Sequence, residues 1–184
     1  MNQSNEELLK AAAGGDLGAF EELIRALEAR VAGVIIGMLG RCPEAEDVGQ
    51  ETFIRFYQGL DKFRGKSSVS SYVTRIAINL SLNELRKRKK NNARFSDIED
   101  AYTNNIQDRE RYDESFPDKE LAWQALQRVR PEFRIVLVLR LMEEYTTKET
   151  AALLDVPEGT VMSRLARGLK EIRKVIFSLE GETK

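Results

Sequence analysis

Apolar residues recur every three or four positions over much of the chain, the spacing that places side chains on one face of a helix. A short first helix is predicted, because Ser4 and Glu7 form a capping box and Gly14 and Gly15 end the pattern. A longer buried helix follows, with an apolar face formed by Phe20, Leu23, Ile24, Leu27, Val31, Val34, Ile35 and Met38.

Two further helices are expected before residue 90. Pro43 suits the first turn of one of them, which has acidic residues near its positive dipole end and runs to about Leu60. Residues 61 to 68 are predicted to form a loop. Apolar periodicity returns from Ser70 to Lys90 and predicts a helix that ends in an unbroken basic run.

Periodicity is absent from residues 91 to 117, which are polar, acidic and poor in aliphatic side chains. Such a segment buries too little apolar surface to fold alone, so it is predicted to be a flexible acidic linker. The chain is therefore expected to be all-α, with two small helical domains over residues 1–90 and 118–184.

The second domain is predicted to contain four helices. A helix over residues 118–129 leads through Pro131 into a strongly apolar one, and Thr146 and Glu149 form a second capping box that opens a short third helix. The last helix spans residues 160–177 and has a basic outer face. Its inward positions are expected to be Val161, Leu165, Leu169, Ile172 and Ile176. No strand pattern and no internal repeat occur.

The composition narrows the possible chemistry. The 184 residues are 42% apolar, with one cysteine, Cys42, and no histidine, which excludes an internal disulfide, an imidazole base and the usual zinc sites. No metal or cofactor is expected. Cys42 is assigned a structural role; redox sensing, the alternative, requires a perturbed thiol. The longest apolar run, residues 31–39, is too short to span a bilayer and the start is acidic, so we expect a cytoplasmic location.

The formal net charge of −1 conceals strongly charged segments. Residues 62–90 carry 9 Lys+Arg and 1 Asp+Glu, whereas residues 1–61 carry 5 and 11, and residues 91–118 carry 3 and 8. The last 26 residues, 159–184, are basic again, with 6 and 3. Two basic segments that alternate with acidic ones are compatible with nucleic-acid binding despite the neutral total.

The pattern of residues 146–174 indicates a helix-turn-helix. A short helix with the small residues Ala151 and Ala152, which allow close helix crossing, is followed by a tight turn and a helix with a basic face. In that geometry Ser163, Arg164 and Arg167 reach base edges or phosphates, while Lys170 and Arg173 follow the DNA backbone. The alternative is a helical hairpin with a solvated basic face.

A second set of residues suits single-stranded nucleic acid. Aromatic and cationic side chains alternate from Asp61 to Lys90, so bases can stack on rings while phosphates meet Lys and Arg. Asn79 and Asn83 are one turn apart and could hydrogen-bond the edge of an extruded base. In the alternative interpretation Phe63 and Tyr72 are core residues and the basic run is solvated.

A third set lies on the helix that begins at Pro43. Asp47, Gln50, Glu51 and Ile54 are three or four residues apart and form an acidic stripe with an apolar edge, which could dock on a basic partner helix. Taken alone, a solvated stripe would have the same pattern.

These motifs, in this order, resemble those of the extracytoplasmic-function sigma factors, the small promoter-specificity subunits of bacterial RNA polymerase. The resemblance covers nearly the whole chain. Its four signature runs are Ala45-Glu-Asp-Val-Gly-Gln-Glu-Thr-Phe53, Leu60-Asp-Lys-Phe-Arg-Gly65, Arg75-Ile-Ala-Ile-Asn79, and Pro157-Glu-Gly-Thr-Val161 followed by Ser163, Arg164 and Arg167.

The resemblance implies a role for each set of residues. Those that match the surface gripping the clamp helices of the polymerase's largest subunit are Asp47, Gln50, Glu51 and Phe53. Those that match the surface melting the minus ten element and capturing a flipped base are Phe63, Arg64, Lys66, Tyr72, Arg75, Asn79, Asn83 and Arg86. Those that match the helix reading the minus thirty-five element are Thr160, Ser163, Arg164, Arg167 and Lys170.

The resemblance further implies core RNA polymerase and promoter DNA as partners, regulation by an anti-sigma protein, and no direct membrane insertion. The linker would run toward the active-site cleft, where its acidity mimics nucleic acid. Gly49 replaces the family's usual aliphatic residue and Tyr72 its usual tryptophan. Met162 and Ala166 occupy positions that are often basic or large, so the family does not supply the base preference of this chain.

Two other functional classes, a stand-alone DNA-binding regulator and an enzyme, fit the sequence less well. A stand-alone helix-turn-helix regulator would bind duplex DNA as a dimer without polymerase, but it has no need of the aromatic and basic segment over residues 63–90. An enzyme is disfavoured, because adjacent carboxylates such as Glu143 and Glu144 point to different helical faces and no nucleophile and base set is visible.

Overall fold

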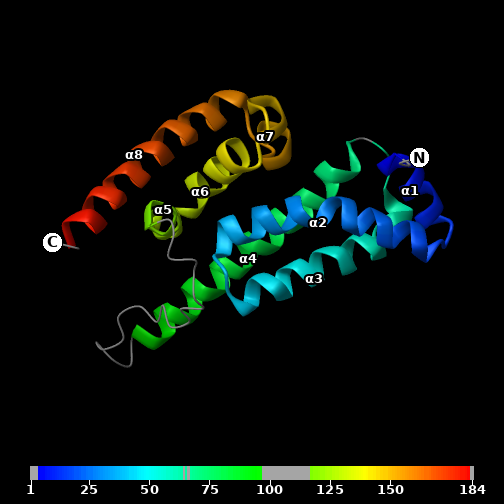
Figure 1. Cartoon of the computed structure of the whole chain (residues 1–184), viewed down its shortest axis with the longest axis horizontal. Coiled ribbons are helices and arrows are strands. Elements are labelled where there is room, and N and C mark those ends of the chain that lie inside the picture. Colours follow the sequence, from blue (N-terminus) through cyan, green and yellow to red (C-terminus); the bar gives the residue numbers. More distant parts are fainter. Residues whose placement is uncertain (1–3, 64, 66, 97–116, 183–184) are drawn as a thin grey trace.

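The structure is a computed structural model that describes residues 4–63, 65, 67–96 and 117–182. The described residues form helices and connecting turns, with no strand, as the all-α prediction required (Figure 1). The elements are α1 (Asn5–Ala13), α2 (Leu17–Leu39), α3 (Pro43–Gln58), the 3₁₀ turn η1 (Leu60–Lys62), α4 (Val69–Ser96), α5 (Pro117–Arg128), α6 (Pro131–Leu137), the π-helical turn η2 (Val138–Met142), α7 (Thr147–Leu154) and α8 (Glu158–Glu182).

Helix starts follow the local signals in the sequence. The Ser4 hydroxyl accepts from the Glu7 amide at 3.3 Å while the Glu7 carboxylate accepts from the Ser4 amide at 3.0 Å, which completes the expected capping box. Thr146 and Glu149 form the same reciprocal pair at the start of α7. The α2 helix ends at Gly40, whose φ of +79° is a conformation that favours glycine.

Two helices are longer than predicted. The α4 helix continues past Lys90 to Ser96, and α8 begins at Glu158 and extends to Glu182. The prediction ended both helices where apolar periodicity stops, whereas a solvated helix can continue through turns that lack this periodicity. Of the predicted linker, residues 97–116 lie outside the described part of the chain.

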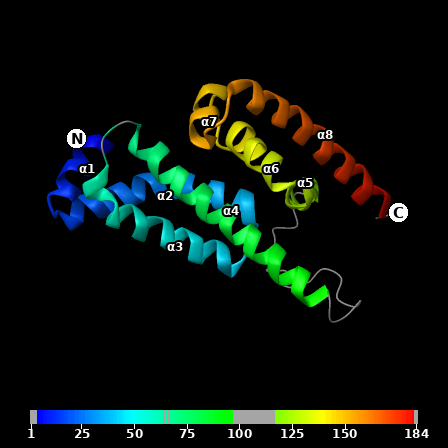
Figure 2. The same ribbon diagram turned by 180° about the vertical axis from the view of Figure 1, so that it is seen from behind.

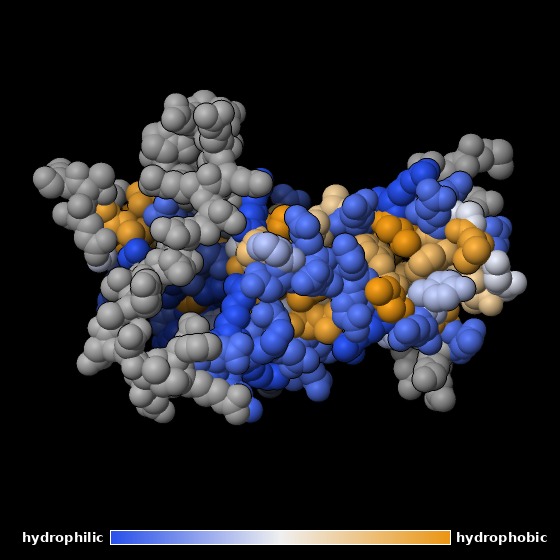
Figure 3. Space-filling model, turned by 90° about the horizontal axis from the view of Figure 1, so that it is seen from below, coloured by the Kyte–Doolittle hydropathy of each residue, from blue (hydrophilic) through white to orange (hydrophobic). Residues whose placement is uncertain are grey.

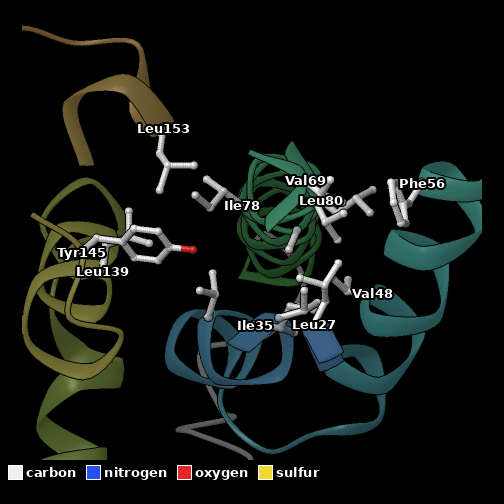
Figure 4. Packing of buried hydrophobic residues seen from close by; sticks show 14 of the residues in the cluster. Leu27, Ile35, Val48, Phe56, Val69, Ile78, Leu80, Leu139, Tyr145 and Leu153 are labelled. Atoms are coloured by element: carbon white, nitrogen blue, oxygen red, sulfur yellow. The ribbon is translucent and has the colours of Figure 1, made fainter. Parts of the chain in front are cut away.

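In the first helical unit, α2, α3 and α4 each pack against the other two. The buried face of α2 includes Leu27 and Ile35, which meet Val48 of α3 and Leu80 of α4 (Figure 4). The α1 helix covers the N-terminal end of α2. Removal of this apolar area from water is the main force that holds the four helices together.

The second unit contains α5 to α8. Its own core is formed by Leu126, Val129, Phe133, Leu137 and Val138, against which Trp123, Leu165 and Ile172 pack. Gly168 on α8 allows the Leu137 side chain to approach closely, since a β-carbon there would lie 3.1 Å from Leu137 Cγ. The expectation that Leu169 points inward is wrong: its side chain is 42% exposed, because the helices that cover α8 lie on the side of Val161 and Leu165.

The two units pack directly against each other, a contact that the prediction of two domains did not include. Tyr145, Leu139 and Leu153 of the second unit point toward α4, and Val48 and Phe56 of α3 lie on its other side (Figure 4). The Tyr145 hydroxyl is hydrogen-bonded to the Thr74 hydroxyl at 3.0 Å. The α4 helix therefore lies between α3 and the second unit, as the reverse view also shows (Figure 2).

Two glycines of α2 allow the second unit to pack closely against this helix. A β-carbon at Gly37 would lie 2.7 Å from Cγ2 of Val138, so only the bare backbone allows this contact. One turn earlier, the Glu143 carboxylate lies over Gly33. None of the helices in the described ranges is both long and apolar enough to cross a membrane.

Candidate nucleic-acid interface

The acidic stripe predicted on α3 is an exposed helix face. Asp47, Gln50 and Ile54 are exposed, while Glu51 is half-buried and accepts a hydrogen bond from Arg55 at 2.6 Å. Phe53 is half-buried against the core. The opposite face, which includes Val48, Thr52 and Phe56, is buried, so α2 and α4 hold the stripe in a fixed orientation.

Apolar side chains adjoin this stripe, and the sequence interpretation identified only one of them. Ile54 was recognised as an apolar edge, but Tyr57 on the same helix is also exposed. Figure 3 views the α3 side of the molecule and shows apolar side chains gathered toward the end where α1 lies, beside a largely hydrophilic surface. The signal that could have revealed Tyr57 is its spacing, three residues after Ile54 and seven after Gln50 on the same helix.

One face of α4 displays four of the residues predicted to bind single-stranded DNA. Arg75, Asn79, Asn83 and Arg86 are all exposed. The Arg86 guanidinium donates to Oδ1 of Asn83 at 3.0 Å, which orients that amide. The two asparagines lie one turn apart on the same exposed face, as their spacing predicted.

The two aromatic residues of this set are packed into the protein rather than freely displayed. Phe63 and Tyr72 are half-buried, with ring centroids 5.2 Å apart in an edge-on arrangement, and Tyr72 contacts Phe56 of the core at 6.2 Å. Their rings attach the segment after α3 to the start of α4. The core role that the sequence left open is therefore present. Two cations of the predicted set, Arg64 and Lys66, lie outside the described residues.

The helix-turn-helix prediction is confirmed. The α7 helix ends at Asp155, which has a left-handed φ of +53°, and α8 begins three residues later. Val161 is fully buried and anchors the start of α8 in the core. Of the two alanines expected at the helix crossing, Ala151 is buried, but Ala152 is exposed, so that part of the expectation is wrong.

The residues predicted to read duplex DNA lie on the first four turns of α8. Ser163, Arg167 and Lys170 are exposed, whereas Thr160 and Arg164 are half-buried. The Ser163 hydroxyl donates to the Thr160 carbonyl at 3.0 Å. At the start of α7, hydrogen bonds from Thr146 hold the pKa of the Glu149 carboxyl below its usual range, which keeps the helix cap charged.

One hydrogen bond joins the exposed α4 face to the helix-turn-helix. The Arg75 guanidinium on α4 donates to the Ala152 carbonyl on α7 at 2.6 Å. The exposed faces of α4 and the helix-turn-helix are thereby brought next to each other. The α3 helix is separated from the helix-turn-helix, because α4 lies between α3 and the second unit (Figure 2).

The cysteine has structural contacts. Cys42 is the N-cap residue of α3, and its Sγ accepts from Arg88 at 3.0 Å and lies 3.7 Å from the Leu39 carbonyl. Arg88 also binds Glu44 at 3.2 Å, so the cysteine belongs to a cluster that joins α4 to the start of α3. Within the described ranges, no cluster of His, Cys, Asp and Glu side chains could hold a metal ion.

Comparison with known families matches both units. Residues 23–91 match the sigma-70 region 2 family, and residues 119–172 match the sigma-70 region 4 family. The chain is 32% identical to the ECF RNA polymerase sigma factor SigM of Mycobacterium tuberculosis, over 95% of this chain and 85% of that protein. It is 29% identical to SigW of Bacillus subtilis, an ECF RNA polymerase sigma factor, over 97% of this chain and all of that protein.

Solved structures share the fold. The sigma factor RpoE of Bartonella quintana, in complex with the anti-sigma factor NepR, superposes with a TM-score of 0.67 at 17% identity and covers 85% of this chain and 96% of its own. CnrH in complex with the cytosolic domain of CnrY gives a TM-score of 0.70 at 19% identity, with 96% of this chain and 99% of that chain covered.

Proposed function

The chain belongs to the extracytoplasmic-function RNA polymerase sigma factors, and from this premise we propose that its three exposed helix faces bind polymerase, open promoter DNA and read duplex DNA. It is a factor that directs promoter-specific transcription initiation. The observation that carries the assignment of surfaces is that α3, α4 and α8 each bury one face and expose predicted site residues on another, so those residues are presented rigidly.

The α3 stripe is proposed to bind core RNA polymerase at the clamp helices of its largest subunit. Asp47 and Glu51 supply negative charge for a basic partner helix, and Gln50 supplies hydrogen bonds. The exposed Ile54 and the half-buried Phe53 add apolar area beside these groups. Charge complementarity would guide the encounter, while the apolar contact would provide most of the lasting affinity.

The α4 face is proposed to open the minus ten element. Asn79 and Asn83 carry amide donors and acceptors at a spacing that suits the edge of one extruded base. Arg75 and Arg86 supply positive charge for the phosphates of the separated strand, as Arg64 and Lys66 are expected to do. Phe63 and Tyr72 support the start of α4, and any stacking on a base must use the exposed part of their rings.

The α8 helix is proposed to enter the major groove of the minus thirty-five element. Ser163 and Arg167 lie near its start, where base edges come within reach, and Lys170 lies one turn further along toward the phosphates. Thr160 and Arg164 are less exposed and border this face. Phosphate contacts would set the affinity, and base contacts the preference for sequence.

Binding both elements requires the two units to separate. Positions minus ten and minus thirty-five are about 25 base pairs apart, roughly 85 Å along B-form DNA. In the free chain, Arg75 and Ala152 from the two DNA-binding surfaces are joined by a 2.6 Å hydrogen bond. We infer that this contact breaks when the protein binds a promoter. Residues 1–90 and 118–184 would then move as the two domains, joined by the linker over residues 91–117.

The remaining parts of the proposal concern partners and chemistry. The polymerase supplies the bond-making step, so no catalytic group, metal or cofactor is assigned to this chain, and its place of action is the cytoplasm. An anti-sigma protein is the proposed regulator. A stand-alone duplex-binding regulator is not favoured, because the family match includes region 2 as well as the helix-turn-helix of region 4.

Reconstitution with polymerase tests the proposal. The purified chain is mixed with bacterial core RNA polymerase and passed over a size-exclusion column; we expect co-elution, followed by selective initiation from a promoter library. Reversal of charge in Glu51→Lys should weaken co-elution, whereas Glu22→Lys, an exposed change on α2, should not. A wild-type chain that never co-elutes with core would overturn the proposal.

A further inference from the structure

The exposed surface at the start of α8 has small side chains at its centre and a large apolar side chain on one flank. Its centre is formed by Gly159, Ser163 and Ala166, all small and exposed. Met162 and Arg167 lie on opposite flanks, and Met162 is 53% exposed. A surface with a low centre allows close approach to another molecule, so the first large group that the other molecule meets on one flank is the Met162 thioether.

Met162 is held in place across the helix-turn-helix. The Thr147 hydroxyl, at the first residue of α7, donates to its Sδ at 3.7 Å. The neighbouring Val161 is fully buried and fixes the helix backbone at this point. The Met162 side chain therefore stays exposed while its backbone is fixed. Little conformational entropy of the backbone remains to be lost on binding.

The chemistry of the side chain limits what it can recognise in a major groove. A thioether has no donor and is a weak acceptor, and its sulfur already faces the Thr147 hydroxyl. It therefore has no proton for the acceptors of guanine or for a phosphate, and as a weak acceptor it offers little to the amino groups of cytosine and adenine. The one apolar feature in the groove is the 5-methyl group of thymine, which apolar side chains contact.

We propose that Met162 determines a preference for thymine at one position of the duplex element read by α8, through contact with the thymine methyl group. The inference rests on the proposed function of α8 and identifies a base-reading residue outside the polar and basic set. Arg167, on the other flank, is left to contact phosphate or guanine.

Deoxyuridine provides the test, because it pairs as thymine does but lacks the methyl group. Holoenzyme made from the full chain and core polymerase selects duplexes from a pool randomised across the upstream promoter element, and the enriched duplexes are remade with uracil at each thymine in turn. One replacement should weaken binding about fourfold, the effect expected when a single methyl group loses its apolar contact.

Variants of Met162 test whether this residue causes the dependence on the thymine methyl group. In Met162→Ala the ratio of thymine to uracil affinity should fall to about one, and in Met162→Leu it should stay near fourfold, since leucine keeps the apolar contact. Phe177→Ala is the matched control: it removes an exposed apolar side chain four turns further along the same helix and should keep the fourfold ratio. Because Met162 is largely exposed, circular dichroism should show unchanged folding in all three variants.

The outcomes separate this inference from the proposed function. If the wild-type holoenzyme enriches a motif but no thymine in it depends on its methyl group, the inference is wrong while the sigma function stands. A methyl dependence that survives in Met162→Ala also overturns it. If the holoenzyme enriches no sequence at all, the proposed function of α8 fails, and the inference fails with it.

Discussion

The Arg134 guanidinium of α6 donates from Nη1 to the main-chain carbonyl of Met38 in the last turn of α2, at 2.6 Å. The same side chain donates to the Val129 carbonyl and to Oε1 of Gln127 at 2.9 Å each. One buried cation therefore satisfies carbonyls of both units, including one at the helix end that lacks an intrahelical partner. Burial lowers the pKa of Arg134 to about 10, so the group stays charged at neutral pH.

Replacement of Arg134 by methionine should destabilise the protein by about 3 kcal/mol, because several buried carbonyls lose a charged donor. Urea denaturation followed by circular dichroism measures the loss. Arg128→Met on the exposed part of α5 is the control and should change the free energy of unfolding by less than about 0.5 kcal/mol. Equal effects of the two substitutions would contradict the role given to Arg134.

The two glycines of α2 should respond to alanine in opposite ways. In Gly33→Ala the new β-carbon meets only the flexible end of Glu143, which can move away, so higher helix propensity should stabilise the protein by up to about 1 kcal/mol. In Gly37→Ala it meets the branched Val138 side chain at 2.7 Å, within a buried helix contact.

We therefore expect Gly37→Ala to separate the two units while the first remains folded. Small-angle X-ray scattering should show a larger radius of gyration for Gly37→Ala than for wild type, and an unchanged value for Gly33→Ala. A Gly37→Ala protein as compact as wild type would contradict this expectation, because α2 and η2 would then have moved apart locally without loss of the contact between the units.

Low pH should favour the arrangement in which the two units are in contact, called closed below, through protonation of Glu143. Burial between the units raises the pKa of this carboxyl, and the nearby Arg30 only partly opposes the shift. A carboxyl with a raised pKa in the closed state stabilises that state at low pH, and the contribution is lost as pH rises from the ordinary value through the raised one. Glu143→Gln removes the charge and should increase closure at neutral pH. Scattering measured from pH 4 to 8 should change less for Glu143→Gln than for wild type.

Packing and base stacking by Phe63 can be separated by experiment. Phe63→Leu keeps apolar volume against Tyr72 but removes the aromatic face, so stability should fall only slightly. If the ring stacks on an unpaired base, the variant holoenzyme should open promoter DNA less well, as permanganate footprinting of unpaired thymines would show. Normal opening would leave Phe63 with its packing role alone.

Asn83 should affect opening without affecting duplex binding. Asn83→Ala removes the amide that Arg86 orients, so a captured base loses hydrogen bonds, and we expect the fraction of open complex to fall about tenfold. Binding of the upstream duplex element should stay unchanged in gel-shift assays. Asn5→Ala, on α1 and far from the α4 face in sequence, is the control.

Local sequence signals were sufficient for most helices and for the exposed face of α4. Capping boxes such as Ser4 with Glu7 involve residues three apart, so their geometry follows from the helix itself. Apolar periodicity identified the buried side of α2 and of most of α8, and the spacing of Asn79 and Asn83 placed both on one exposed face. The same criterion was wrong at Leu169 and at the end of α4, because periodicity does not report which neighbour covers a helix face or how far a solvated helix continues.

The contact between the units depended on the tertiary structure. Arg134 and Met38 are 96 residues apart in the sequence, and Arg75 and Ala152 are 77 apart. Nothing in the local pattern distinguishes Arg134 from exposed cations such as Arg128 and Arg130, or Gly37 from an ordinary helix residue. Their roles arise only where the two units meet. Whether a cation is buried, and whether a β-carbon fits, depends on the side chains and backbone of the facing unit. Short-range sequence patterns thus determined the helices. The arrangement in which the α4 face and the helix-turn-helix lie together was decided by packing between residues far apart in the sequence, because burial depends on the surface opposite.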